Sequence, residues 1–372
     1  MSKQVILRPH VDRLLLGLTL VLAVGGFIFF ISSALGIFAI NESKFNNMVL
    51  NQSIFLLLGI FLLFVVSIYG SYEHIRRYAL PFFALALVMC FMVFIPGLGF
   101  EHGGARRWLN LGFITLQTGE VLKIAAVVYC AGWYSLFQNK IQEFKYGLFP
   151  LICVLGLSAL ALLIQPDTDT YAVLAVACVS IYFAAGGSWK DISILAIAGV
   201  GGLGVLVATR PYLLERFITL FSNAKVDIYN EGYQMYQSLI AIGSGGVFGT
   251  GIGQSVQKFG YVPEPAGDSI FAIISEEVGF IGAVTVAILF TLLFLRIIYI
   301  AKRAETNFGG LLALGIGMLI LTQVAFNTYS MIGLIPLSGL PLPLISHGGT
   351  ALLLTLLQIG VILNISKTMR NI

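Results

Sequence analysis

The chain has 372 residues, of which 58% are hydrophobic and 10% are charged. Soluble globular proteins carry about a quarter charged residues, so this composition excludes a soluble fold and makes the lipid bilayer the main solvent. The net charge of +4 is small and no basic run with interleaved aromatic residues occurs, which argues against nucleic acid as a partner. The four cysteines lie singly in apolar runs, which favours packing over metal binding or disulfides.

Apolar runs long enough to cross a bilayer recur along the chain. Residues 1–13 are basic and precede an apolar run that is too long for a cleaved signal peptide, so we expect an uncleaved first helix. Since a spanning helix needs about 20 apolar residues, we predict an all-α polytopic membrane protein with about ten transmembrane helices, in a single domain over residues 1–372. The predicted helices cover residues 14–40, 48–70, 78–97, 117–136, 147–165, 169–186, 191–208, 269–298, 309–331 and 346–366.

Basic residues are distributed unevenly among the segments that join these helices. An even number of spans puts both termini on one side, and the segments on that side carry thirteen of the 21 lysines and arginines but only five acidic residues. Because cytoplasmic segments are enriched in Lys and Arg, we predict that both termini are cytoplasmic. Two long segments, 97–116 and 209–268, then lie on the outer side, the second as a large loop between helices seven and eight. We expect ordered re-entrant or surface-lying helices in both.

The first outer segment and the start of the next helix carry candidate site residues. Arg107 and Trp108 lie in the outer segment, and Thr118 is the expected cap of the fourth helix. Glu120 and Lys123 are three residues apart and share a helix face. A lysine about one turn into an apolar helix is costly unless it is paired or faces a wet cavity. Lys123 is therefore either a snorkelling partner of Glu120 or a cation directed at a phosphate.

The large outer loop begins with two arginines and continues into a glycine-rich stretch. Arg210 and Arg216 suit lipid phosphates, either as substrate contacts or as simple headgroup anchors. The glycine-rich stretch 243–253 can bring backbone amides close to a phosphate. It lacks the GK[ST] ending of a Walker loop, so tight packing of a re-entrant turn explains it equally well.

Carboxylates gather where this loop enters the eighth helix. Asp268 lies at the entry, in a position expected to be near water, and is close in sequence to Lys258 and Glu264. Glu276 and Glu277 lie two turns deeper in an apolar span. Carboxylates inside a membrane are expensive, so this pair marks either a functional site or an ion pair with Lys123 or another buried cation.

The segment before the last helix contains three prolines, which exclude a regular helix over residues 336–343. Ser346 and Thr350 are expected to start the last helix. His347, between them, is either a proton carrier or a hydrogen-bonded structural histidine.

Short motifs are spread over nearly the whole chain. They are Arg107-Trp108-Leu109-Asn110-Leu111-Gly112, Gly119-Glu120-Val121-Leu122-Lys123, Arg210-Pro211-Tyr212, Tyr236-Gln237-Ser238, Gln257-Lys258, Pro263-Glu264, Asp268, Glu276-Glu277-Val278-Gly279 and Gly339-Leu340-Pro341-Leu342-Pro343. Each motif is weak alone, but the ordered set is very specific, and it resembles that of the SEDS family (FtsW, RodA and SpoVE) of peptidoglycan glycosyltransferases. The stretch Gly253-Gln254-Ser255-Val256-Gln257-Lys258 is more similar to the FtsW/SpoVE branch than to the RodA branch.

Three positions depart from the family pattern. Ala266-Gly267 precede Asp268 where the family has His-Thr, and Thr118-Gly119 precede Glu120 where it has Pro-Ser. His347 stands where the family has Tyr. The carboxylate of Asp268 is therefore kept while its sequence neighbours are changed.

The resemblance implies a reaction and a site for it. The expected reaction is inverting polymerisation of lipid II at the outer membrane face with release of undecaprenyl diphosphate, in cell division or cell-shape maintenance. Asp268 is the expected general base, and Arg107, Lys123 and Arg210 are expected at the diphosphate. The other expected site residues are Trp108, Glu120 and Lys258 at the substrate, and Glu264, Glu276, Glu277 and His347 in support.

The resemblance also implies a location in the bacterial cytoplasmic membrane and a class B penicillin-binding protein transpeptidase as partner, with other divisome or elongasome membrane proteins. It implies no obligatory cofactor and leaves a divalent cation, Mg²⁺ or Mn²⁺, open. Two other functions remain open as well: a flippase or proton-coupled carrier for lipid II, and a non-enzymatic divisome scaffold. The lack of paired hydropathy halves with broken helices argues against a carrier, and the presence of Asp268 argues against a scaffold.

Overall fold

The computed structural model describes residues 11–102, 105–110, 112, 115–221 and 231–369. Each predicted span corresponds to one apolar helix in the described chain, with ends that differ by a few residues. Six of these helices are long and apolar enough to cross a membrane, and α4, α6 and α7 are apolar but shorter. The tenth, α5, has 19 residues but carries Glu120 and Lys123 and belongs to neither group. The helices are α1 (Arg13–Ile40), α2 (Glu42–Tyr69), α4 (Ala79–Met92), α5 (Thr118–Leu136), α6 (Leu148–Ile164), α7 (Thr168–Ala184), α8 (Trp189–Thr209), α11 (Ile270–Arg303), α12 (Asn307–Met331) and α13 (Gly349–Ser366).

Short elements connect these helices at both ends of the bundle. Helix α3 (Tyr72–Arg77) joins α2 to α4, and a 3-10 turn (Gln138–Lys140) follows α5. Helices α9 (Pro211–Phe221) and α10 (Glu231–Ser244) lie in the large loop after α8, as the sequence predicts for that segment. The four cysteines are free, and Cys90, Cys130 and Cys178 are buried, which agrees with a packing role.

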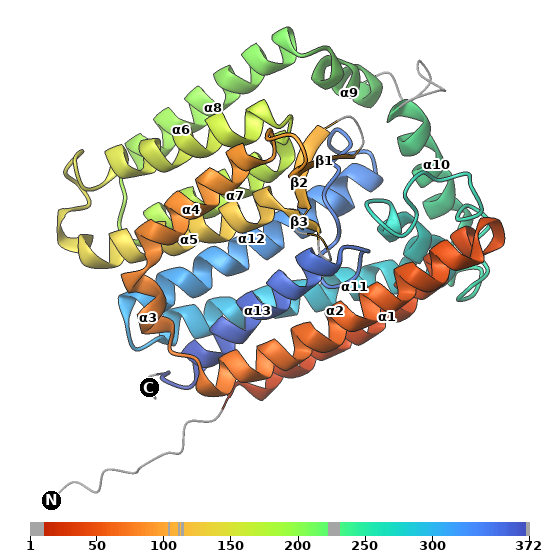
Figure 1. Cartoon of the computed structure of the whole chain (residues 1–372), viewed down its shortest axis with the longest axis horizontal. Helices are drawn as coiled ribbons and strands as arrows, with labels where there is room; N and C mark the ends of the chain where they lie inside the picture. The colour runs from red at the N-terminus through yellow and green to blue at the C-terminus, as the bar shows by residue number, and fades with distance from the viewer. Residues whose placement is uncertain (1–10, 103–104, 111, 113–114, 222–230, 370–372) are drawn as a thin grey trace, which may run out of the picture.

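Helix α12 lies at the centre of the bundle, and α8 lies at its edge (Figure 1). In the most apolar stretch of α12, 67% of the residues are buried, whereas the corresponding stretch of α8 buries none. Glycines let neighbouring helices approach α12 closely: a Cβ on Gly315 would lie 2.5 Å from Ile181 of α7, and one on Gly317 would lie 2.8 Å from Ile297 of α11. Small residues at such contacts are typical of helix packing in membranes.

The first outer segment forms a small antiparallel sheet, so the prediction of helices over 97–116 is wrong. Strands β1 (Gly99–His102), β2 (Ala105–Asn110) and β3 (Thr115–Gln117) pair in the order β1-β2-β3. The two ends of β2 bury Ala105 and Leu109 and expose the residue that follows each, which is the pattern of a strand with one covered face. Strand β3 leads directly into α5, so the sheet covers the end of the bundle where α5 begins (Figure 1).

Helix α11 is broken at Gly279, whose backbone has φ 67° and ψ −167°. Amides of the glycine-rich loop donate to the carbonyls freed near the break, from Thr250 to Glu276 at 3.0 Å and from Gly251 to Glu277 at 2.9 Å. A Cβ on Gly249 would lie 2.2 Å from the carbonyl oxygen of Glu277, so only glycine allows this contact. The loop thus satisfies the backbone of a broken helix within an apolar region, and its glycines serve packing.

Two predicted helix starts differ from the structure. Gln117 precedes α5 and makes no side-chain cap, and Thr118 is the first residue of the helix. The Thr118 hydroxyl donates to the Arg107 carbonyl at 3.4 Å instead of capping its own helix. Helix α13 begins at Gly349 and not at Ser346, because the Ser346 hydroxyl is bonded to the backbone of the preceding loop.

Candidate active site

Asp268 lies just before α11, in a segment that other elements hold through its backbone. Three donors, Asn327 Nδ2, Ser346 Oγ and His347 N, reach the consecutive carbonyl oxygens of residues 268, 267 and 266 at 2.7, 2.8 and 2.7 Å. The segment 266–268 is therefore tied to α12 and to the loop before α13. Since these contacts use the backbone, they are compatible with the small residues that replace the family's usual His-Thr.

The carboxyl group of Asp268 is half-buried among charges of both signs. Its pKa is raised from 3.8 to about 7, chiefly by burial and then by the nearby Glu264 and Asp169, while Arg216 and Arg107 act in the opposite direction. These five residues are called the Asp268 cluster below. A carboxyl group with a pKa near 7 can act as a general base at neutral pH.

Arg216 reaches this cluster from the short helix α9. Its Nη1 lies 3.3 Å from Asp169 Oδ2, and the backbone N–H of Gly339 donates to the same oxygen at 3.2 Å. Gly339 also lies beside the base, because a Cβ at this position would be 3.6 Å from Asp268 Oδ2. Three separate elements, α7, α9 and the loop before α13, thus meet at Asp268.

Arg107 projects from β2 toward the end of α6. It donates from Nε to the Gln165 carbonyl at 3.1 Å and from Nη2 to the Pro166 carbonyl, and its Nη1 lies 3.9 Å from Asp167 Oδ1. Carbonyl groups at a helix C-terminus attract cations, so this end of α6 orients the guanidinium. The Arg107 side chain keeps 27% of its surface exposed, whereas Asp167 is buried. Trp108, the next residue on β2, is half-buried.

Lys123 and Glu120 form a buried ion pair in α5. The Lys123 Nζ lies 2.7 Å from Glu120 Oε1 and also donates to Gln323 Oε1 on α12 at 2.5 Å. Gln323 in turn donates to the Pro341 carbonyl at 2.9 Å. Lys123 is thus paired with Glu120, which was one of its two predicted roles, and it is joined through Gln323 to the loop that reaches Asp268.

Asn327 lies one turn beyond Gln323 on α12 and is fully buried. Its amide nitrogen donates to two carbonyl oxygens, that of Asp268 at 2.7 Å and that of Leu340 at 2.9 Å. One side chain therefore sets the distance between the segment that carries the base and the loop before α13.

Lys258, Glu276 and Glu277 form a separate group, called the Lys258 cluster together with Ser32 and Ser255. Lys258 Nζ lies 2.8 Å from Glu277 Oε1, and both side chains are fully buried. Ser32 Oγ on α1 donates to Glu277 Oε1 at 2.6 Å, and Ser255 Oγ donates to Glu276 Oε2 at 2.5 Å. Every charge here has a partner, so the cluster fastens the loop to α1 and α11.

The remaining predicted site residues lie at the margin of the site. Arg210 caps the end of α8 and its side chain is exposed. Glu264 is exposed beside Asp268. The His347 ring stacks on Phe30 with a centroid distance of 5.6 Å, which supports the structural alternative for this histidine.

The structure adds residues that the sequence interpretation did not place in the site: Asp167, Asp169, Gln323, Asn327, and Arg216, which it considered only as a contact to lipid phosphates. Two signals could have found most of them. The two aspartates follow directly on the apolar run of α6, and Gln323 and Asn327 are four residues apart on an otherwise apolar helix, so that they share a face. The described residues offer no cluster of three or more His, Cys, Asp and Glu side chains suited to a metal ion. The divalent cation that the family resemblance leaves open stays a prediction.

Sequence comparison connects this site to known proteins. The profile of the FtsW/RodA/SpoVE family, described as a cell cycle protein, matches residues 12–371. The chain belongs to this family. It is 40% identical to stage V sporulation protein E of Bacillus subtilis, over 77% of this chain and 79% of that one. It is 38% identical to a probable peptidoglycan glycosyltransferase FtsW of Coxiella burnetii, over 80% of each chain. These relatives place it in the FtsW/SpoVE branch.

Solved structures share its fold. A chain from a peptidoglycan synthase complex, described for its coordination of polymerization and crosslinking, superposes with a TM-score of 0.78 and 24% identity, covering 96% of this chain and 97% of that one. The rod shape determining protein RodA of Thermus thermophilus superposes with a TM-score of 0.71 and 23% identity over the whole of both chains. At these identities the likeness establishes a RodA-like multi-pass membrane fold.

Proposed function

We propose that this chain is a peptidoglycan glycosyltransferase that polymerises lipid II at the outer face of the cytoplasmic membrane. Curated relatives that cover most of the chain are named as probable peptidoglycan glycosyltransferases. The observation that carries the proposal is the Asp268 cluster: a carboxyl group with a pKa near 7, held by three backbone hydrogen bonds and flanked by two arginines.

The proposed reaction needs a base and a stabilised leaving group. The Asp268 carboxylate takes the proton of the attacking 4-hydroxyl, and that oxygen forms a bond to the anomeric carbon of the second, diphosphate-linked sugar. The bond from this carbon to the diphosphate oxygen breaks, and undecaprenyl diphosphate leaves with the electron pair. A positioned base contributes about 10²–10⁴ in rate, and cations directed at the leaving oxygens stabilise their charge.

Arg107 and Arg216 are the proposed cations at the diphosphate. Both act electrostatically on Asp268, and the Arg107 side chain keeps surface free for a ligand. Lys123 acts through the network of Gln323 and Glu120, while the exposed Arg210 meets lipid headgroups at the membrane surface. Trp108 lies beside Arg107, where an aromatic face suits a sugar ring.

Two further features of the proposal concern orientation and partners. Because basic segments face the cytoplasm, we place both termini there. Asp268 then lies at the outer end of the bundle. A chain of similar fold belongs to a complex that couples polymerization to crosslinking, which supports a class B penicillin-binding protein transpeptidase as partner. Helix α8, with no buried residue in its apolar stretch, offers a large surface to lipid or to such a partner.

The proposal is tested by glycan polymerisation from purified lipid II, with this chain alone and with its transpeptidase partner. We expect glycan strands from the wild type and at least about 10² less from Asp268→Asn, which keeps the side-chain shape but removes the base. Equal rates for both would remove Asp268 from its role. A protein that moves labelled lipid II across vesicles and makes no glycan under either condition would instead be a flippase.

A further inference from the structure

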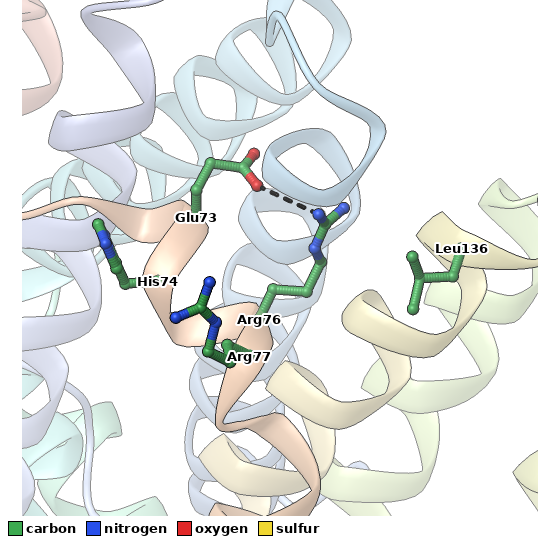
Figure 2. A pocket seen from close by; sticks show the side chains of 5 residues that line it. All are labelled: Glu73, His74, Arg76, Arg77 and Leu136. Atoms are coloured by element: carbon green, nitrogen blue, oxygen red, sulfur yellow. Dashed lines mark ion pairs between the residues drawn. The ribbon is translucent and has the colours of Figure 1, made fainter.

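A cavity of about 550 Å³ opens between α3 and the end of α5. Figure 2 shows its lining side chains: Glu73, His74, Arg76 and Arg77 come from α3, and Leu136 faces them from the last turn of α5. Helix α3, which supplies most of the lining, lies at the end of the bundle opposite the sheet (Figure 1). None of the lining residues belongs to either charge cluster described above.

The fold holds the cavity in shape. Tyr72, the first residue of α3, is buried, and its backbone N–H donates to Asn364 Oδ1 of α13 at 3.3 Å. Arg76 lies against α5 where there is no side chain: a Cβ on Gly132 would be 3.6 Å from the Arg76 Cγ. Helix α3, which carries Arg76 and Arg77, is thus fixed between α13 and α5.

The cations that line the cavity have few partners. Within the described chain, the side chains of His74 and Arg77 make no hydrogen bond or ion pair, and Arg76 has only a 3.9 Å ion pair with Glu73. An Arg guanidinium presents a planar set of donors that matches phosphate oxygens. The cavity therefore presents unused phosphate donors to its interior.

Other cations at this end of the bundle are arranged differently. Lys140 and Lys145 lie over the Tyr146 ring, at 5.3 and 5.5 Å from its centre, and Arg303 lies over Tyr299 at 4.3 Å. In the cavity, by contrast, three neighbouring basic side chains and the carboxylate of Glu73 line one space. The arrangement on α3 is therefore specific to this place.

The surroundings of the cavity suit a lipid. Helix α3 joins the ends of two apolar helices, α2 and α4, so it lies at the depth of the phospholipid headgroups. Leu136, which lines the cavity, and Tyr78 and Leu80, which follow α3 in the chain, are 62%, 61% and 61% exposed. Exposed apolar side chains are thus available near α3 for contact with acyl chains.

From this geometry we infer that the cavity between α3 and α5 binds the phosphate of a phospholipid headgroup through Arg76 and Arg77. A soluble phosphate ester offers the same chemistry, and the experiment separates these two sources. This inference does not depend on the proposed glycosyltransferase activity, because the experiment measures lipid binding and not glycan formation.

The test is native mass spectrometry of the full chain in mild detergent, titrated with dioleoyl phosphatidylglycerol. We expect one saturable lipid adduct on the wild type, and about tenfold or greater weakening of this adduct in Arg76→Ala/Arg77→Ala. The single variant Arg77→Gln should weaken it in the same direction, and it disturbs no contact of the fold. Thermal unfolding without added lipid checks that each variant is folded.

The matched control is Lys190→Ala/Lys302→Ala, which removes the same charge from exposed positions at the same end of the bundle. Undiminished binding by the control supports the site, whereas equal weakening in both double variants shows general charge attraction and overturns it. Unchanged binding by Arg76→Ala/Arg77→Ala overturns it as well. Displacement of the lipid by millimolar glycerol phosphate or inorganic phosphate would assign the site to a soluble phosphate, and failure to displace it assigns the site to the lipid.

Discussion

The Asp268 cluster and the Lys258 cluster both place carboxylates next to cations, but they differ in how completely the protein buries and pairs these charges. In the Lys258 cluster, Lys258 and Glu277 form a fully buried ion pair, and Glu276 accepts hydrogen bonds from Ser255 and Val256. The Asp268 cluster gathers three carboxylates near two arginines and leaves Asp268 half-buried, with a pKa raised to about 7. Breaking a closed buried pair destabilises a fold, whereas a partly open carboxyl group with a raised pKa retains reactivity.

The largest expected effect is on the reaction. Asp268→Asn should lower the rate of glycan formation by about 10²–10⁴, because the amide cannot accept the proton of the attacking hydroxyl. The three backbone hydrogen bonds of its segment remain, so the thermal unfolding temperature should stay near that of the wild type. A large loss of stability in this variant would place Asp268 with the structural cluster instead.

Glu277→Ala should show the reverse of Asp268→Asn, with its main effect on stability and not on the rate of glycan formation. It leaves Lys258 buried without a partner, which costs about 3–5 kcal/mol of stability and should lower the unfolding temperature in detergent. The double variant Lys258→Met/Glu277→Leu, which removes both charges and keeps the volume, should recover most of that loss. If the double variant folds well but makes no glycan, the cluster contributes to the chemistry and the contrast fails.

Asn327→Leu should lower kcat about tenfold and leave the KM for lipid II nearly unchanged, because the variant loosens the base and removes no substrate contact. The matched control is Asn364→Leu. Asn364 is another buried asparagine that donates to two carbonyls, those of Ser67 at 3.2 Å and Gly70 at 2.9 Å, at the other end of the bundle. Equal loss of kcat in both variants would indicate a general structural effect.

The smallest expected effect is a shift of the pH profile. The base is active when deprotonated, so the rate should rise with pH through about 7 and fall about tenfold per unit below that midpoint. Glu264 raises the pKa of Asp268, so Glu264→Gln should move the midpoint to lower pH. Rates of both proteins measured from pH 5 to pH 9 test this, and a midpoint that stays in place would exclude Glu264 from the cluster.

The sequence predicted the helices and the family well, because long apolar runs and ordered motifs are local properties. Each span matched one helix, and membership in the FtsW/SpoVE branch was confirmed. The sheet over 97–116 was missed, since its strands have three to six residues and their pairing joins positions that no local pattern connects.

The sequence also could not predict which charged side chains lie next to one another in the fold. The sequence left open whether Glu276 and Glu277 pair with Lys123 or with another cation, and the fold selects the second alternative by pairing Lys258 with Glu277. The selection of Arg210 over Arg216 could have been refined by helix phase: Arg216 is three residues from the buried Leu213 on α9 and so shares its inward side. The role of each candidate in substrate binding stays a prediction.

The break at Gly279 also bears on how the protein sits in bilayers of different thickness. The part of α11 beyond the break, residues 280–303, is about 36 Å long, which exceeds a hydrocarbon core of about 30 Å. A helix of that length can tilt in the bilayer, and its tilt changes when the membrane thins or thickens. The glycine-rich loop holds this part of the helix as well, because Phe280 donates to the Gly246 carbonyl at 2.9 Å and Ile281 to the Val247 carbonyl at 3.2 Å. A change of tilt therefore acts directly on the loop that also receives Glu276 and Glu277.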